Sequence, residues 1–386
     1  MRLFPLFFAL FFLISVNNAN AQVIPPDRDP LPPDAKIGSY YSVLPLLGYN
    51  SDQGFIGGGL LQRINYDINL RPFLSMLKTD ITFSTNGEII SKLEYDRTRL
   101  FGSDIRSRID FIGQRERKGH YFGIGNDSEF SDSAYEDGFN FYENREFFLN
   151  YIVRKGILAF GESGNLDFFG DVTFWRVNGL STGDETLFFS DEPEGFGSAR
   201  VVKAGFGFIA DSRNSEFSPN TGVRYEVGFN TSHSVLFSNF SFTSLNGDFR
   251  HYFPLRHNIT IAHRLVAEHT LGDAPFWSLP IIGNENGLRG YHRNRFRGDS
   301  SVLSMLELRT WLFSVFDDRI DIGMQTFWDT GRVYSDFDSG AFFDGWKQVF
   351  GIGTAFTLLN PDLIIRGDVG FSNETWRIYF GAGYVF

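Results

Sequence analysis

Apolar and polar side chains alternate along most of this chain with a period of two residues. The alternation is clearest at the carboxyl end, where one parity consists of Ile378, Phe380, Ala382, Tyr384 and Phe386. Successive side chains of a β-strand point to opposite faces of its sheet, so this pattern predicts strands with one apolar face. No helical period persists over three turns, and we expect an all-β fold.

Alternating segments recur along the chain, separated by Gly, Asn, Asp or Ser, and they are expected to pair as antiparallel hairpins. They cover residues 44–49, 55–64, 88–100, 103–114, 147–153, 166–177, 201–210, 223–229, 243–253, 258–269, 301–313, 319–329, 349–358, 363–371 and 376–386. Many exceed the usual strand length of soluble sheets and suit a tilted crossing of a bilayer. At roughly 22 residues for a strand with its connection, the chain has room for about 16 strands. We therefore predict a transmembrane antiparallel β-barrel with a long loop folded into its lumen.

The chain divides into three parts. Residues 1–21 have the pattern of a signal peptide, with Arg2, an apolar run over residues 3–16, and a small-residue cleavage site at residues 19–21. Residues 22–41 are rich in proline and charge and are expected to form a periplasmic tail. Residues 42–386 are expected to form the barrel. A cleaved leader ahead of such a barrel predicts the outer membrane of a Gram-negative bacterium.

Composition narrows the functional classes. The chain has 45 Phe, 15 Tyr and 41 Gly, no Cys, and a formal net charge of −11. The high aromatic content is typical of a barrel that exposes apolar residues to lipid and polar ones to a wet interior. The negative charge argues against nucleic acid as a partner, because binding phosphates requires clustered positive charge. Without cysteine, disulfides and thiolate metal sites are excluded.

A Gly-rich, Arg-rich loop over residues 283–299, here called the lumen loop, lies between two long predicted strands. Its tip consists of Gly287, Leu288, Arg289, Gly290 and Tyr291. The flanking glycines permit a tight turn. The alternation turns two acids of the following strands, Glu307 and Asp329, away from the apolar face. Either the arginine folds inward and is held by these acids, or it lies on an exposed loop and the acids line a wet channel.

Several segments resemble the bacterial surface antigen family, the barrel part of the BamA/TamA outer-membrane assembly superfamily. The motifs are a strand motif with Asp211, Arg213, Pro219 and Gly222, the tip over residues 287–291, the strands around Glu307 and Asp329, and the terminal Phe386. The resemblance implies that Arg289 contacts Glu307 and Asp329 and that Phe386 serves in barrel recognition. Family members that assemble barrels normally carry periplasmic POTRA modules, and residues 22–41 leave no room for one.

We expect no catalytic residues, no cofactor and no metal site. The sequence lacks a Gly-x-Ser-x-Gly elbow, a His-Glu-x-x-His motif and a phosphate loop. Of the evenly spaced His251, His257, His263 and His269, only the last two share a predicted strand, too far apart to bind one metal ion. The inward-facing charges, expected to line the lumen and form structural pairs, are Lys203, Asp211, Arg213, Arg224 and Glu226. Likewise, Arg293, Arg295 and Arg297 are expected to solvate the lumen loop or meet lumen acids.

The resemblance implies an integral outer-membrane barrel that takes part in inserting or translocating proteins or lipids. A weak contact between the first strand, near residues 44–49, and the last, residues 376–386, would allow the barrel wall to open. Expected partners are outer-membrane lipids, nascent outer-membrane proteins and a separate periplasmic protein or lipoprotein. The alternative is a passive or plugged pore, or a structural barrel, without insertase activity.

Overall fold

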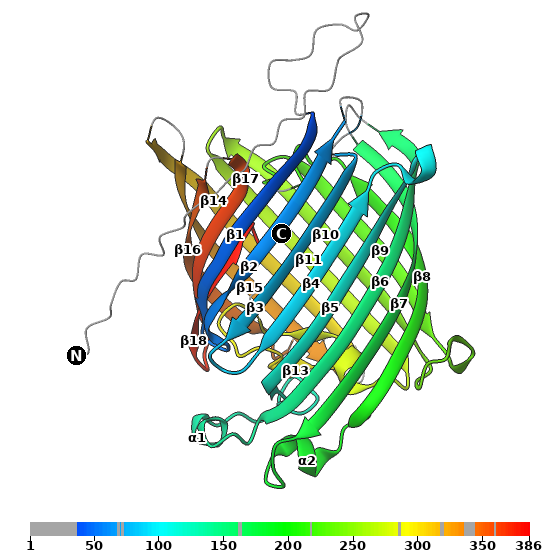
Figure 1. The fold of residues 1–386 in the computed structure, drawn as a ribbon. Helices are drawn as coiled ribbons and strands as arrows, with labels where there is room; N and C mark the ends of the chain where they lie inside the picture. The colour runs from blue at the N-terminus through cyan, green and yellow to red at the C-terminus, as the bar shows by residue number, and fades with distance from the viewer. Residues whose placement is uncertain are drawn as a thin grey trace, which may run out of the picture.

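Sixteen antiparallel strands form one sheet that curls into a nearly closed barrel (Figure 1). The computed structural model describes residues 37–67, 70, 73–160, 164–216, 218–284, 287–316, 320–335, 344–358 and 360–386. The predicted signal peptide and most of the predicted tail lie outside these residues. The predicted fold class, a 16-stranded antiparallel barrel, is confirmed.

Each barrel strand pairs with the next one along the chain, except that β11 pairs with β14. The barrel strands are β1 (Gly38–Asn50), β2 (Gly54–Tyr66), β3 (Ser75–Ser84), β4 (Ile89–Arg97), β5 (Ile105–His120), β6 (Phe141–Phe160), β7 (Gly164–Ser181), β8 (Gly197–Asp211), β9 (Gly222–Ser232), β10 (Phe242–Arg256), β11 (Ile259–Gly272), β14 (Ser300–Val315), β15 (Ile320–Tyr334), β16 (Lys347–Leu358), β17 (Asn360–Phe371) and β18 (Trp376–Ala382).

Shorter elements lie in the connections. They are α1 (Asp132–Glu136), α2 (Leu187–Asp191), the short pair β12 (Ile281–Ile282) and β13 (Phe296–Arg297), and the 3-10 turns η1 (Leu100–Gly102), η2 (Ser234–Leu236) and η3 (Phe276–Ser278). Both α-helices lie at the end of the barrel opposite the start of β1 (Figure 1). No helix among the described residues is long and apolar enough to cross a membrane.

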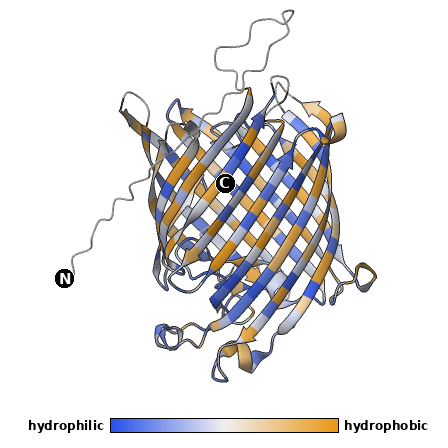
Figure 2. Ribbon diagram, in the orientation of Figure 1, coloured by the Kyte–Doolittle hydropathy of each residue, from blue (hydrophilic) through white to orange (hydrophobic). Residues whose placement is uncertain are grey.

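The predicted alternation is visible in the barrel wall (Figure 2). In β14, Leu306 and Leu308 are exposed on the outer face, whereas Leu303 and Glu307 are buried. The inner face is not uniformly polar, however. Beside the lumen loop it carries a packed apolar cluster formed by Tyr252, Ala262, Ile282, Leu288, Tyr291, Phe296, Leu303, Met305, Phe327, Val333, Val349 and Phe386. The lumen on this side is therefore filled by side chains.

Two features at the amino end differ from the expectation. The strand β3 is not among the predicted segments, although Leu77, Ile81 and Phe83 share one parity of residues 75–84 and Lys78 and Asp80 lie on the other. Pairing with β2 and β4 nevertheless holds the segment in the sheet. In addition, β1 starts at Gly38, inside the segment expected to be tail.

The last strand is shorter than its alternation suggests. It ends at Ala382 instead of continuing to residue 386. Gly383 has a φ of +80°, a conformation that favours glycine, and its amide donates to the Ile364 carbonyl at 2.8 Å. The chain then turns away from the wall, and Phe386 is buried in the apolar cluster of the lumen. The expectation that Phe386 continues the outward parity of β18 is therefore wrong.

The two ends of the sheet meet along a seam between β1 and β18. Among the described residues, no ladder of paired residues joins these two strands. Hydrogen bonds lie at one end of this seam, where the Ser51 amide donates to the Ile378 carbonyl at 3.2 Å and the Ile378 amide donates to Ser51 Oγ at 3.0 Å. Among the described residues, β1 and β18 are therefore held together at the end of the barrel where the β1–β2 turn lies, and not along the rest of β1.

Candidate functional site: the lumen loop and its ion cluster

The lumen loop folds back into the barrel between two short paired strands. Ile281 of β12 pairs with Arg297 of β13, which brings the two ends of the loop together. At the tip, Leu288 has a φ of +59° and Gly290 has a φ of +147°. These conformations reverse the chain tightly, and they place the intervening Arg289 against the inner wall.

Arg289 is held by two strand acids. Its Nη1 donates to Glu307 Oε1 at 2.6 Å, and its Nε and Nη2 each donate to an Asp329 oxygen at 2.8 Å. Its backbone amide also donates to Asp329 Oδ2, at 3.2 Å. All three side chains are fully buried. The structure therefore brings together the predicted tip arginine and both predicted acids, in a planar, bidentate geometry that suits guanidinium.

Further charged side chains complete a buried ion cluster around Arg289. The Asp368 carboxylate lies 3.6 Å from Arg289 Nη1 and also accepts from Arg366 and Gln325. Arg309 Nη2 lies 2.7 Å from Glu307 Oε2. Three guanidinium groups therefore face three carboxylates, and the cluster is neutral. A balanced cluster avoids the large cost of an unpaired charge in a buried site.

The electrostatic balance at the tip favours the charged arginine. Burial lowers the pKa of Arg289, but the neighbouring Asp329 and Glu307 carboxylates outweigh burial and raise that pKa above its ordinary value. The guanidinium also stacks on the Phe327 ring, with Cζ 3.6 Å from the ring centroid. Arg289 is therefore a permanent cation whose role is to hold the loop rather than to exchange protons.

The tip also packs directly on the backbone of β17. A Cβ at Gly370 would lie 1.6 Å from the Arg289 carbonyl oxygen, and a Cβ at Gly290 would lie 3.1 Å from the Gly370 carbonyl carbon. The first distance is too short for any side chain, and the second is a tight contact. Gly370 is therefore required for the loop to reach its acids, and sequence reasoning missed it because nothing in the alternation marks the contact.

Beyond the tip, the loop is fixed to the β17–β18 hairpin. Tyr291 Oη donates to Asn373, Ser372 Oγ donates to the Gly290 carbonyl at 2.9 Å, and Arg295 Nε donates to Glu374 Oε2 at 2.8 Å. These contacts place the loop beside the carboxyl-terminal edge of the seam.

The loop also reaches the amino-terminal side of the barrel. Arg293 Nη1 lies 2.9 Å from Glu88 Oε1 and 2.7 Å from Glu116 Oε1. Arg293 and Arg295 thus meet acids, as expected. Arg297 differs, because its guanidinium stacks on Phe276 at 4.9 Å and its Nε has no hydrogen-bond partner among the described residues.

The strand motif lies at a separate place, in the turn between β8 and β9. Arg213 Nη2 donates to Asp211 Oδ2 at 2.7 Å, Pro219 is buried in the turn, and Gly222 begins β9. Arg224 Nη2 pairs with Glu226, and Lys203 lies on the inward parity of β8. These residues form local structural pairs, apart from the ion cluster.

The histidines are arranged differently from the expectation. His251 in β10 is the register partner of His263 in β11, so the turn between these strands brings them together instead of separating them. Their rings stack with centroids 5.9 Å apart, and each ring bonds a hydroxyl, that of Tyr225 or Ser304. This stacked arrangement does not converge on a metal position.

Comparisons with known proteins agree with the barrel fold. A family model described as the Omp85 superfamily domain matches residues 164–386. BamA from Haemophilus ducreyi lacking POTRA domains 1–3 matches at 13% identity with a TM-score of 0.58, over 90% of this chain and 70% of the solved chain.

Two structures of CdiB also match, both at 10% identity. The match to CdiB from Escherichia coli has a TM-score of 0.59 and covers 95% of this chain and 67% of the solved chain. The match to CdiB from Acinetobacter baumannii has a TM-score of 0.55 and covers 89% of this chain and 59% of the solved chain. At these identities the likeness shows the fold alone. A comparison with curated proteins finds no match.

Proposed function

This chain belongs to the Omp85 superfamily, and on that basis we propose that it takes part in inserting or translocating proteins at the Gram-negative outer membrane. The lipids of that membrane are its surroundings, and nascent outer-membrane proteins are its proposed substrates. We propose no covalent chemistry, because strand exchange and passage through a barrel wall need none. Residues 1–21 are proposed to act as a cleaved export signal.

The seam between β1 and β18 is the observation that carries this proposal. The strand β1 has 13 residues, whereas β18 has seven and turns inward after Ala382. Most of the β1 edge therefore has no partner in β18 among the described residues. An unpaired strand edge is a template for another strand, because its amide and carbonyl groups remain free to pair.

Substrate insertion would begin at this edge. An incoming strand could pair with β1 by backbone hydrogen bonds, which do not depend on its sequence, while its alternate side chains face lipid and lumen. Successive hairpins would then widen the seam until the new barrel separates. The buried ion cluster supports this role by holding the β14–β18 wall in shape while the seam opens.

Substrate recruitment is proposed to need a separate component. Because Omp85 family members work with partner proteins, we propose that a periplasmic protein or lipoprotein delivers substrates to the seam. Copurification in mild detergent would identify this partner.

A disulfide across the seam tests the function. A Cβ built at Gly48 lies 3.8 Å from Phe380 Cβ, which is the usual Cβ separation in a disulfide. Because the chain has no cysteine, Gly48→Cys with Phe380→Cys provides one defined pair. In proteoliposomes, we expect the oxidised variant to lose insertion of a small outer-membrane barrel protein and to regain it on reduction.

The matched control is Ile81→Cys with Ser91→Cys, which face one another across the β3–β4 hairpin away from the seam. This pair is expected to insert substrate equally well when oxidised and reduced. Equal insertion by the oxidised and reduced seam variants would refute a role for seam opening. Insertion absent in every form, with lipid exchange between leaflets that responds to oxidation, would instead assign lipids as the substrate.

A further inference from the structure

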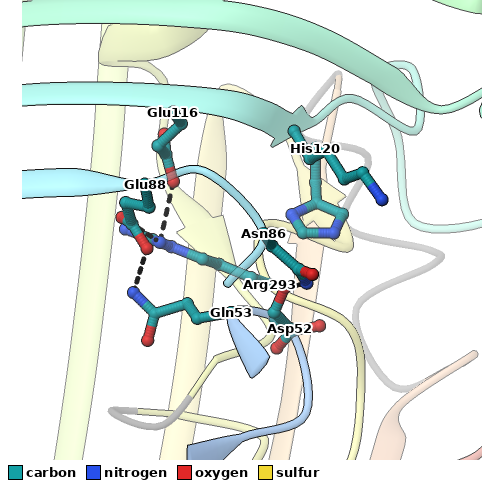
Figure 3. Close-up of a pocket in the computed structure, with 8 residues that line it drawn as sticks. Asp52, Gln53, Asn86, Glu88, Glu116, His120 and Arg293 are labelled. Carbon is teal, nitrogen blue, oxygen red and sulfur yellow. Dashed lines mark hydrogen bonds and ion pairs between the residues drawn. The ribbon is translucent and has the colours of Figure 1, made fainter. Parts of the chain in front are cut away.

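Three potential metal ligands from distant parts of the chain converge beside the seam. They are Asp52 in the β1–β2 turn, His120 at the end of β5 and His292 in the lumen loop. One ligand atom from each lies within 4.8 Å of the other two, and Asp52 Oδ1 is 3.5 Å from His292 Nδ1. Figure 3 shows the His120 imidazole turned toward the turn that carries Asp52.

The polar atoms of this cluster are buried without sufficient partners. Asp52, His120 and His292 are 5%, 3% and 2% exposed. Among the residues that the structure describes, neither Asp52 carboxylate oxygen has a hydrogen-bond partner, and neither does His120 Nδ1. Buried polar atoms are nearly always satisfied, so an ionised carboxylate and an imidazole nitrogen left open toward the same point indicate a missing ligand.

The surroundings have the features of a metal site. His120 Nε2 is 2.9 Å from Tyr135 Oη, which orients the ring and leaves Nδ1 free for a ligand. The Tyr135 ring also packs on His292, with centroids 4.1 Å apart, and Phe122 and Phe130 pack on the same imidazole. An aromatic shell of this kind excludes water from the donors.

The charge states suit a divalent cation. Burial raises the pKa of Asp52, but the nearby His292 imidazole and the charge of Arg377 outweigh burial and lower it to about 2, so the carboxylate is ionised. Burial lowers the pKa of His292 despite the opposing effect of Asp52, so this imidazole is a neutral donor at pH 7. Two imidazoles and one carboxylate form a donor set that zinc accepts, with one further position open.

We propose that Asp52, His120 and His292 bind a single divalent transition-metal ion of the zinc class. A tetrahedral zinc ion holds its ligand atoms about 3.3 Å apart, so binding would draw the three donors closer together. The ion would join the first hairpin, β5 and the lumen loop at one point. It would thereby fix the loop to the amino-terminal side of the barrel.

Arg377 of β18 competes for this position. Its Nη1 lies 3.6 Å from Asp52 Oδ1 and its Nη2 contacts the His292 ring, whereas its Nε has no hydrogen-bond partner within the described part of the chain. The guanidinium therefore neutralises Asp52 without satisfying it. A dication would displace Arg377 from Asp52, which would also remove an ionic contact across the seam.

Cobalt(II) provides a direct probe. We expect the purified full chain, carrying no histidine tag, to bind one equivalent of Co²⁺ with the visible d–d absorption of a tetrahedral site, and one equivalent of Zn²⁺ to remove that absorption. Asp52→Asn, His120→Ala and His292→Ala should each weaken Zn²⁺ binding more than about 100-fold, and Tyr135→Phe should weaken it about tenfold. Each variant is first tested for the heat-modifiable gel mobility of a folded barrel.

His263→Ala is the matched control, because it removes an imidazole from the outer face of β11, outside the cluster, and should leave binding unchanged. Arg377→Gln should tighten Zn²⁺ binding by removing the competing cation. A wild-type chain without tetrahedral Co²⁺ absorption overturns the proposal, and so does binding that the three ligand variants leave intact. The readout uses purified protein without substrate, so the result does not depend on the proposed function.

Discussion

At the scale of single residues, Arg289 is stabilised by the match between a planar guanidinium and two carboxylates. Its three donor nitrogens and its backbone amide all reach Glu307 or Asp329. A lysine would carry the same charge but present one compact ammonium, which cannot bond both acids in this fork geometry. The residue type is therefore set by directional bonding as well as by charge.

Replacing Arg289 should destabilise the barrel. Arg289→Ala leaves buried acids without their partner and is expected to cost about 3–5 kcal/mol of unfolding free energy. Arg289→Lys should cost less, because the charge remains. Urea unfolding in lipid vesicles measures both changes, and limited proteolysis reports release of the lumen loop. The control Arg256→Ala removes an exposed arginine and should change little; equal stability of Arg289→Ala and the control would contradict the internal contact.

A single methyl group at Gly370 should displace the loop tip. The added Cβ would collide with the Arg289 carbonyl, a backbone atom that cannot rotate away. We expect Gly370→Ala to cost about 1–3 kcal/mol and to increase proteolysis within the loop. The control is Gly170→Ala in β7, where a Cβ would make only an ordinary contact at 3.7 Å. If both variants resist protease equally, the position of the loop tip does not depend on its close contact with the β17 backbone.

At the scale of elements, alternation predicted where strands lie better than where they end. The two discrepancies, at β3 and at β18, have different causes. The β3 segment, absent from the predicted strands, carries Lys78 and Asp80 on its inner face, and β2 and β4 pair with its backbone on both sides. The β18 segment ends early because Gly383 turns the backbone inward, although Tyr384 and Phe386 continue the apolar parity. Parity describes a strand only while the backbone stays extended.

The inward turn gives Phe386 a structural role. It packs in the lumen cluster, and its carbonyl accepts from Arg309 Nη2 at 2.8 Å. Phe386→Ala should therefore lower the unfolding free energy by about 3 kcal/mol once the barrel is assembled. Urea unfolding of the purified barrel measures this loss. A variant that assembles poorly in cells but unfolds normally when purified would assign Phe386 to recognition alone.

At the scale of the whole molecule, the lumen loop obstructs the barrel interior. Its tip, the ion cluster and the apolar cluster occupy the side formed by β14–β18. We therefore expect low conductance for the wild-type chain in planar bilayers and higher, fluctuating conductance for Arg289→Ala. Equally low conductance in both would mean that the loop remains in place without its arginine.

The sequence alone was sufficient for the architecture and for one part of the site. Parity placed Glu307 and Asp329 inside, and the family motif identified the arginine that meets them. The Asp52, His120 and His292 cluster was not predictable, because each residue comes from a different connection or strand end. Curvature of the barrel brings such positions together, and no local pattern in the sequence records it.

The lumen loop is joined unequally to the two sides of the seam. Toward β14–β18 it is bound by the fully buried ion cluster, whereas toward β1–β5 it is bound by Arg293 with Glu88 and Glu116 and by His292 with Asp52. When the seam opens, we expect the loop to move with the carboxyl-terminal strands, which would leave Glu88 and Glu116 without their contact to Arg293. A substrate chain entering through the open seam would then meet an acidic inner surface, which should favour substrate segments rich in lysine and arginine.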